Sequence, residues 1–204
     1  MSGAGSDPGS RSRGRPRDPA VEAAILRAAY ELFVERGADG ASIERIAKRA
    51  GVGKLTVYRR WSSKDDLIAQ AIEAAVETRN WPANDELAAM PVRELAERML
   101  DQQAEAAASP EFRALVSQVF GSSVSHPSLM ETYWRHYIVP RRRATATMLE
   151  QAKRDGTIPS DTDVEVLIDM MAGAVTYRVL QPDPPDATEM RRYLRALYHQ
   201  SGLL

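Results

Sequence analysis

Cysteine is absent from this chain of 204 residues, which excludes disulfides and thiolate metal sites and suits a cytoplasmic protein. No run of about 18 apolar residues is present to span a membrane, and the N-terminus is polar rather than signal-like. Runs of β-branched residues with a period of two are also missing, whereas apolar residues recur at helical spacing. We therefore expect an all-α, cytoplasmic protein with no membrane contact.

The net charge of −1 hides an uneven distribution of charge along the chain. Residues 1–64 hold 13 Lys or Arg against 7 Asp or Glu, a balance of +6, whereas residues 65–204 hold 14 against 21, a balance of −7. A basic first third joined to an acidic remainder is the expected footprint of a module that meets a polyanion. Chance clustering of surface charge is the alternative explanation.

The stretch from Ser42 to Lys64 has the pattern of a helix, a tight turn and a second short helix. Apolar residues recur at helical spacing in its first half, and Gly51 supplies the left-handed residue that ends a helix. The second helix begins near Lys54, with Leu55 or Val57 packing inward. Its outward face would carry Lys54, Thr56, Tyr58, Arg59 and Arg60. This is a helix-turn-helix, whose second helix can lie in the major groove of DNA.

The flanks of this stretch fit the same interpretation. Residues 1–17 read as a disordered arm in which Arg13, Arg15 and Arg17 resemble the core of an AT-hook, suited to a narrow minor groove. A first helix from about Asp18 completes a DNA-binding domain over 18–64, with Trp61 in its core. Residues 65–79 would form a connecting helix.

Residues 80–204 have the pattern of further helices, expected at about 91–108, 110–120, 128–155, 161–180 and 187–200, with a kink or break at Pro140. Kinked helices lined with large side chains often border a cavity, which would suit a small apolar effector, although the same residues could simply fill a helical core. The candidate ligand-binding residues are Met99, Phe120, Met130, Trp134, Tyr137, Met148, Met171 and Tyr177.

The last two predicted helices have apolar residues over more than one narrow stripe. One face can pack on the body while another pairs with a second copy of the chain. A four-helix bundle across a two-fold axis would satisfy both, so we expect a homodimer. The candidate interface residues are Leu167, Met171, Ala174, Val175, Met190, Leu194 and Leu197.

The order and spacing of motifs in the first 80 residues resemble the DNA-binding domain of the TetR family of bacterial transcriptional regulators. The matching segments are 33–37 (FVERG), Ser42 with Ile46 and Ala47, 50–52 (AGV), 56–59 (TVYR), and Trp61 with Lys64, Asp66 and Leu67. The resemblance implies a three-helix DNA-binding domain, with a helix-turn-helix, linked to a C-terminal helical ligand-binding and dimerisation domain over 80–204. Those later residues match only as an all-helical remainder of suitable length.

The resemblance also assigns roles to residues. It implies that Lys54, Thr56, Tyr58 and Arg59 are the recognition contacts, that Lys64 meets a phosphate, and that the N-terminus at Ser42 sits on the DNA backbone. The sequence departs from the family at three places. Gly53 stands where a serine is common, Leu55 where a small residue is common, and Arg60 with Trp61 where an aromatic pair is usual. These changes bear on operator preference, and Leu55 offers apolar contact to a thymine methyl.

The expected function is therefore that of a ligand-responsive transcriptional regulator, namely a repressor that a small apolar effector releases from double-stranded DNA. Two alternatives compete with it: an architectural DNA-binding protein without an effector, and an enzyme. The enzyme is disfavoured because residues 121–125 lack the second glycine of a nucleophile elbow and Lys54 lacks the rest of a phosphate loop. His126, His136 and His199 have no metal-ligand spacing, so we expect no cofactor and no metal.

Overall fold

The computed structural model describes residues 18–77 and 90–204, and every regular element in these ranges is a helix, which confirms the predicted fold class. The arm with Arg13, Arg15 and Arg17 lies outside the described residues. The helices are α1 (Pro19–Gly40), α2 (Ile43–Arg49), α3 (Lys54–Tyr58), α4 (Lys64–Glu77), α6 (Val92–Ala108), α7 (Pro110–Gly121), α8 (Pro127–Tyr133), the π-helix η1 (Trp134–Ile138), α9 (Val139–Arg154), α10 (Val164–Val179) and α11 (Ala187–Gln200).

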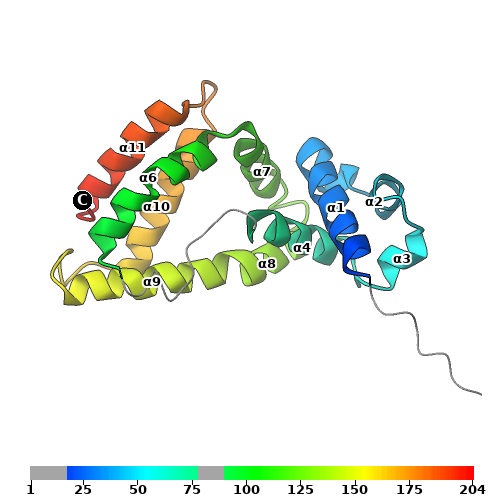
Figure 1. Ribbon diagram of the computed structural model, residues 1–204, viewed down its shortest axis with the longest axis horizontal. Helices are drawn as coiled ribbons and strands as arrows, with labels where there is room; N and C mark the ends of the chain where they lie inside the picture. Colours follow the sequence, from blue (N-terminus) through cyan, green and yellow to red (C-terminus); the bar gives the residue numbers. More distant parts are fainter. Residues whose placement is uncertain (1–17, 78–89) are drawn as a thin grey trace, which may run out of the picture.

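The chain folds into a head, formed by α1 to α3, and a body, formed by α6 to α11, with α4 between them (Figure 1). Side-chain caps fix the starts of the head helices. The Asp18 carboxylate accepts from the Ala20 amide at 3.0 Å, and the Ser42 hydroxyl accepts from the Arg45 amide at 3.3 Å. Gly51 then takes a φ of 68°, which turns the chain from α2 into α3.

The core of the head continues into the body. Its fully buried side chains come from all four of the first helices and include Phe33, Ile46, Val57 and Leu67. The same cluster contains Leu115 and Val119 of α7 and Leu129 of α8. Trp61 is 4% exposed, so its predicted core position is confirmed. Since apolar contacts run without a break from α1 to α7, the head is seated on the body by packing as well as by the chain.

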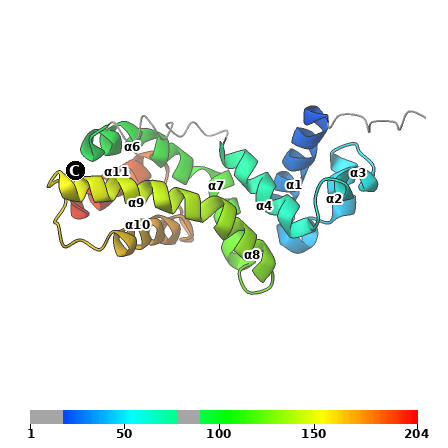
Figure 2. The same ribbon diagram turned by 90° about the horizontal axis from the view of Figure 1, so that it is seen from below.

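A second core holds the body together, with buried residues from α6, α9, α10 and α11. Leu100, Leu149 and Met190 are among its fully buried side chains. Figure 2 shows α6 and α10 on either side of α9. Between α9 and α10, Arg142 of α9 pairs with Asp169 and Glu165 of α10, and hydrogen bonds to these two carboxylates raise the pKa of the Arg142 guanidinium. The cluster of arginines at 141–143 therefore includes one acid-paired member.

The kink or break predicted at Pro140 takes the form of a widened turn. Proline has no N–H, so the usual bond to the carbonyl four residues earlier is lost. The chain passes through η1 just before this point, and the Val139 amide donates to the carbonyl of Trp134, five residues back. α8, η1 and α9 follow one another without a gap as one long, bent rod from α4 to the far end of the body, and Figure 2 shows α8 turned away from the axis of α9 (Figures 1 and 2).

Candidate functional site

The recognition helix α3 presents most of its side chains to solvent. Val57 is fully buried and anchors the helix on the head core. Leu55 is 71% exposed and Tyr58 is 61% exposed. Of the two inward candidates, Val57 is therefore the one that packs, and Leu55 faces outward. Lys54 and Arg59 are also exposed, and Thr56 is half-buried.

Two features at the start of α3 bear on contact with an anion. Gly53 is its N-cap residue and offers no side-chain hydrogen bond, and a Cβ built on it meets no atom within 4 Å. The Lys54 ammonium pairs with Glu44 of α2. The hydrogen bond from Lys54 is the main cause that lowers the pKa of the Glu44 carboxyl, and the positive charge of Lys54 adds to it. Because both side chains are exposed, Lys54 can exchange this partner for a phosphate.

Lys64 lies at the start of α4, half-buried, and its Nζ donates to the backbone carbonyl of Ala38 at 2.8 Å. Ser63 caps this helix by accepting from the Asp66 amide at 3.0 Å. Asp66 in turn accepts from Gln70, which accepts from the indole N–H of Trp61 at 3.0 Å. This chain of bonds links α4 to the end of the recognition helix.

The helix-turn-helix is fastened to α1 by a two-point ion pair. The Nη1 and Nη2 of Arg49 donate to the two carboxylate oxygens of Glu35, each at 2.8 Å. The hydrogen bond from Arg49 lowers the pKa of the Glu35 carboxyl, and the same hydrogen bond raises the pKa of the Arg49 guanidinium. Planar pairing of this kind fixes orientation as well as distance, so α2 and the turn that follows it are held on α1.

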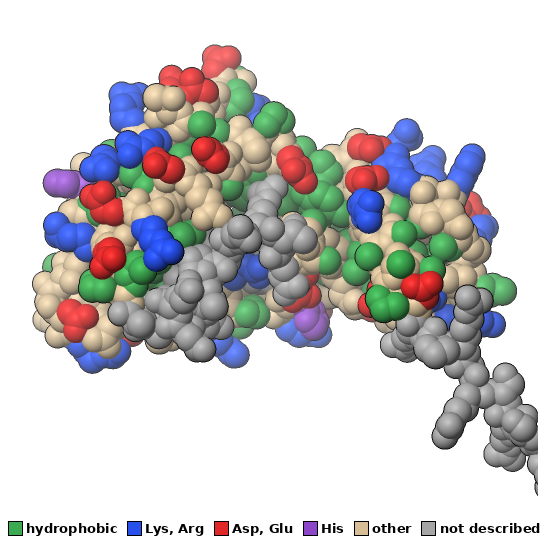
Figure 3. All heavy atoms as spheres, viewed as in Figure 1, with side chains coloured by type: hydrophobic (Ala, Val, Ile, Leu, Met, Phe, Trp, Pro, Cys, Tyr) green, Lys and Arg blue, Asp and Glu red, His purple; other side chains and the backbone are tan. Residues whose placement is uncertain are grey.

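Figure 3 shows Lys and Arg side chains gathered along one edge of the head.

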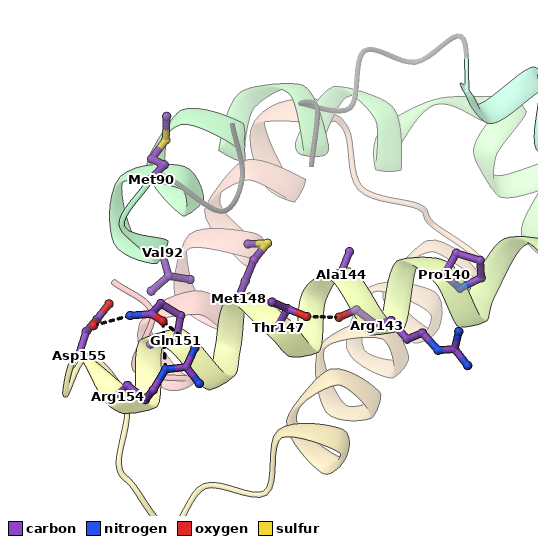
Figure 4. A pocket seen from close by; sticks show the side chains of 11 residues that line it. Met90, Val92, Pro140, Arg143, Ala144, Thr147, Met148, Gln151, Arg154 and Asp155 are labelled. Carbon is purple, nitrogen blue, oxygen red and sulfur yellow. Dashed lines mark hydrogen bonds between the residues drawn. The ribbon is translucent and has the colours of Figure 1, made fainter. Parts of the chain in front are cut away.

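A pocket of about 470 Å³ opens between the start of α6 and one face of α9 (Figure 4). Ala144, Thr147, Met148 and Gln151 line it at the spacing of one helix stripe. Met90 and Val92 close it from α6 and the residues just before it. Its rim is polar, with Arg154 bonded to Gln151 and Gln151 bonded to Asp155. The volume is in the range of ordinary small-molecule sites.

The residues predicted to bind a ligand do not all meet at this pocket. Met148 lines it, and Met99 is buried in a small cluster that Met148 and Met90 pack against. Met130 is half-buried against the head core, and Met171 against the body core. The side chains of Phe120, Trp134 and Tyr177 are exposed, and that of Tyr137 lies outside the described ones. The sequence feature that could have indicated the pocket is the run of small and polar residues on one stripe of α9, none of which was among the predicted ligand-binding residues.

The residues predicted at a dimer interface lie mainly toward the body. Leu167, Met190 and Leu194 are buried in the body core, and Met171, Val175 and Leu197 pack half-buried against it, while Ala174 is half-buried. The opposite face of α10 has an apolar stripe exposed to solvent; a second apolar face was predicted, but none of the stripe's residues was among the candidate interface residues. It consists of Val166, Met170, Gly173, Tyr177 and Leu180, and it is called the α10 stripe below. The alternating spacing of four and three residues is that of a helix-packing seam.

Within residues 18–77 and 90–204, no group of three His, Cys, Asp or Glu side chains is placed to hold a metal ion. No helix in the same ranges has the length and apolarity needed to cross a membrane.

Comparison with known proteins gives matches over both parts of the chain. Residues 25–71 match the profile of bacterial regulatory proteins of the tetR family, and residues 91–197 match the tetracyclin repressor-like C-terminal domain. The chain is similar to YdeS, an uncharacterised HTH-type transcriptional regulator of Bacillus subtilis, with 31% identity over 173 residues and 82% of each chain covered.

Solved structures agree with these matches. The crystal structure of the TetR family transcription regulator SCO0332 has a TM-score of 0.64 at 29% identity, over 88% of this chain and 97% of that one. The fold is also similar to that of FadR from Bacillus subtilis, solved in complex with stearoyl-CoA, with a TM-score of 0.68 at 17% identity over 85% and 96% of the two chains. This chain therefore belongs to the TetR family of bacterial transcriptional regulators, and is a DNA-binding regulator rather than an enzyme.

Proposed function

We propose that this regulator is a repressor that binds a near-palindromic operator as a homodimer and is released by a small, largely apolar effector. The observation that carries the proposal is the recognition helix, in which one buried residue, Val57, holds an exposed surface that includes Leu55 and Tyr58. An exposed leucine and tyrosine on a basic head have no partner inside the head and suit the base edges of a major groove.

Contacts to the operator would divide by role. Leu55, Thr56, Tyr58 and Arg59 face the bases, while Lys54, Lys64 and the amides at Gly53 and Ser42 meet phosphates. Both Ser42 and Gly53 are N-cap residues, and the first amides of a helix have no backbone partner within that helix, so they can donate to a DNA phosphate. The arginines at 13, 15 and 17 would enter the adjacent minor groove.

Dimerisation would use the α10 stripe. Met170 and Tyr177 are 63% and 73% exposed. Large apolar residues that follow one another at helical spacing on one helix form a patch that favours a partner helix. The same stripe on a second copy provides a self-complementary surface, as a two-fold interface requires. Two heads would then reach successive major grooves, about 34 Å apart.

The effector would bind the pocket between α6 and α9. Support comes from its volume of about 470 Å³, its methionine and alanine lining, and its polar rim. FadR, which shares the fold, is complexed with stearoyl-CoA, which supports a ligand-binding role for the body. The effector's influence on DNA affinity can be no larger than its differential affinity for the two conformations of the dimer.

The test begins with selection of an operator from random duplexes, followed by fluorescence anisotropy at several salt concentrations. We expect affinity to fall steeply with salt, and Tyr58→Ala and Lys54→Ala to weaken binding while the dimer stays folded. Arg192→Ala, which removes an exposed cation on α11, is the control and should bind as the wild type does. Unchanged affinity in both α3 variants would contradict the role of this helix.

Effector control needs a separate measurement. Thermal-shift screening with small apolar compounds should identify ligands that stabilise the protein, and the same ligands should release the labelled duplex. Ligands that stabilise the protein without changing DNA affinity would favour the architectural alternative.

A further inference from the structure

The last turn of α1, residues 37–40, is held by contacts from four other elements, and is called the α1 joint below. Two of the contacts come from the head side. The Nη1 of Arg45 in α2 donates to the carbonyl of Gly40 at 3.0 Å, and Lys64 of α4 donates to the carbonyl of Ala38. The other two come from the body, through Gln118 of α7 and through His126, the residue before α8.

Gln118 lies against the joint because a glycine leaves room for it. Gly37 takes a φ of 69°, in the left-handed region, and a Cβ built on it would lie 2.8 Å from the Oε1 of Gln118. The Nε2 of the same side chain donates to the carbonyl of Val34 at 3.4 Å. One half-buried amide therefore covers the point where the regular geometry of α1 is interrupted.

His126 reaches the joint from the other side. Its Nε2 lies 3.1 Å from the Oδ1 of Asp39, with the imidazole side chain 17% exposed and the carboxylate side chain 89% exposed. The backbone around this histidine is fixed as well: its amide donates to the carbonyl of Ser122 at 2.8 Å, and its carbonyl accepts from the Met130 amide at 3.2 Å. The backbone that carries the imidazole thus belongs to the body, while the partner of the imidazole belongs to the head.

We propose that Gln118 and His126 are positioning residues that set the angle of the DNA-binding head on the body through the α1 joint. This inference rests on the proposed binding of an operator by a dimer. It adds a polar connection between body and head to the covalent path through α4 and the apolar packing of α1 on α7. In a dimer, the head angle determines the distance between the two recognition helices, and one base-pair step of DNA is only about 3.4 Å. A small rotation at the joint therefore changes which half-site spacing fits.

The test measures spacing preference, which a merely stabilising contact would not alter. Duplexes carrying the selected operator, and the same operator with one base pair added or removed at its centre, are titrated by fluorescence anisotropy. We expect the wild type to discriminate against both altered spacings. His126→Ala, and His126→Ala combined with Gln118→Ala, should lower that discrimination about fivefold or more, the lower end of ordinary coupling between sites.

Three further variants make the result specific. His126→Gln keeps an N–H donor toward Asp39 and should recover most of the discrimination. Asp39→Ala removes the acceptor from the head side at an exposed position, so that it tests the contact without disturbing the body. Val124→Ala, at a 92% exposed site in the same connection between α7 and α8, is the control and should match the wild type.

The outcomes separate this inference from the proposal it rests on. If the wild type binds none of the duplexes, operator binding itself is refuted. If the wild type prefers one spacing, and His126→Ala, Asp39→Ala and the double variant keep the same ratio of affinities, operator binding stands and the positioning role of Gln118 and His126 is overturned.

Discussion

The ammonium of Lys64 donates to the backbone carbonyl of Ala38 at 2.8 Å, joining the start of α4 to the last turn of α1. The family resemblance assigns this lysine to a DNA phosphate. The two roles are compatible, because an ammonium has three N–H donors and the side chain is only half-buried. A lysine bound in this way would meet a phosphate with its side chain already held in place, so that less side-chain freedom would be lost on binding.

Replacing Lys64 should therefore have two separable effects. In Lys64→Ala the loss of a hydrogen bond from a charged donor should lower the free energy of unfolding by about 1 to 2 kcal/mol, measured by chemical denaturation. The slope of log affinity against log salt should become shallower by about one for each head that loses a phosphate contact. A stability loss with an unchanged salt slope would show that Lys64 serves only Ala38.

Leu55 gives a prediction about sequence preference. Its exposed side chain would gain from contact with a thymine methyl, so replacing single thymines in the operator by uracil should weaken wild-type binding about fivefold at the contacted position, the value of one buried methyl group. Leu55→Ala should bind the thymine and uracil duplexes equally. Anisotropy with a duplex series measures both. Equal sensitivity to uracil in the two proteins would assign the methyl contact to another residue.

The head was predictable because each of its signals is local. The first two helices begin next to Asp18 and Ser42, Gly51 takes the left-handed turn, and Trp61 is buried, as the sequence indicated. The choice between Leu55 and Val57 was left open, since a five-residue helix has too few positions to define its inward face. The packing of Val57 into a core shared with α1 and α4 decides it.

The body was less predictable because its apolar residues cover more than one face of each helix. In α10, Leu167 and Val166 are adjacent and equally apolar, yet the first is buried and the second exposed. Only the placement of α6 and α9 determines which face turns inward. A cavity is still harder to predict, because it depends on the space between helices rather than on the residues of one helix, and Tyr177 proved to be exposed while Ala144 lines the pocket.

The α10 stripe leads to a prediction about assembly. Met170→Glu places a charge in the middle of the stripe, where pairing with a second copy would bury it without a partner, so the dimer should dissociate. Size-exclusion chromatography with light scattering measures the mass, and circular dichroism should show that the helices persist. Val124→Glu is the matched control, since it makes the same kind of change at an exposed apolar site after α7, and it should leave the mass unchanged. A Met170→Glu dimer as stable as the wild type would place the interface elsewhere.

The pair of Arg49 and Glu35 predicts a dependence of stability on pH. The hydrogen bond from Arg49 lowers the pKa of the Glu35 carboxyl in the folded protein. Its contribution to stability is therefore present above the unfolded-state pKa and is lost as the pH falls through the lowered folded-state pKa. Glu35→Gln should have a lower Tm than the wild type at pH 7, and the two should converge in acid. Glu105→Gln, at an exposed site on α6, is the control. A difference that persists unchanged below the folded-state pKa would mean that packing, not charge, is responsible.

Filling the pocket should separate effector response from DNA binding. Ala144 of α9 lines the pocket, so Ala144→Phe would occupy part of the 470 Å³ with a side chain. Because the pocket lies far from α3 along the rod of α8 and α9, the variant should keep wild-type affinity for the operator (Figure 1). It should lose both the thermal stabilisation by any ligand found in the screen and the release of DNA by that ligand. Val124→Phe introduces the same side chain at an exposed site and should respond as the wild type does. A full ligand response in Ala144→Phe would exclude this pocket as the effector site and direct attention to the interior of the body around Leu100 and Leu149, where any cavity would have to open on binding.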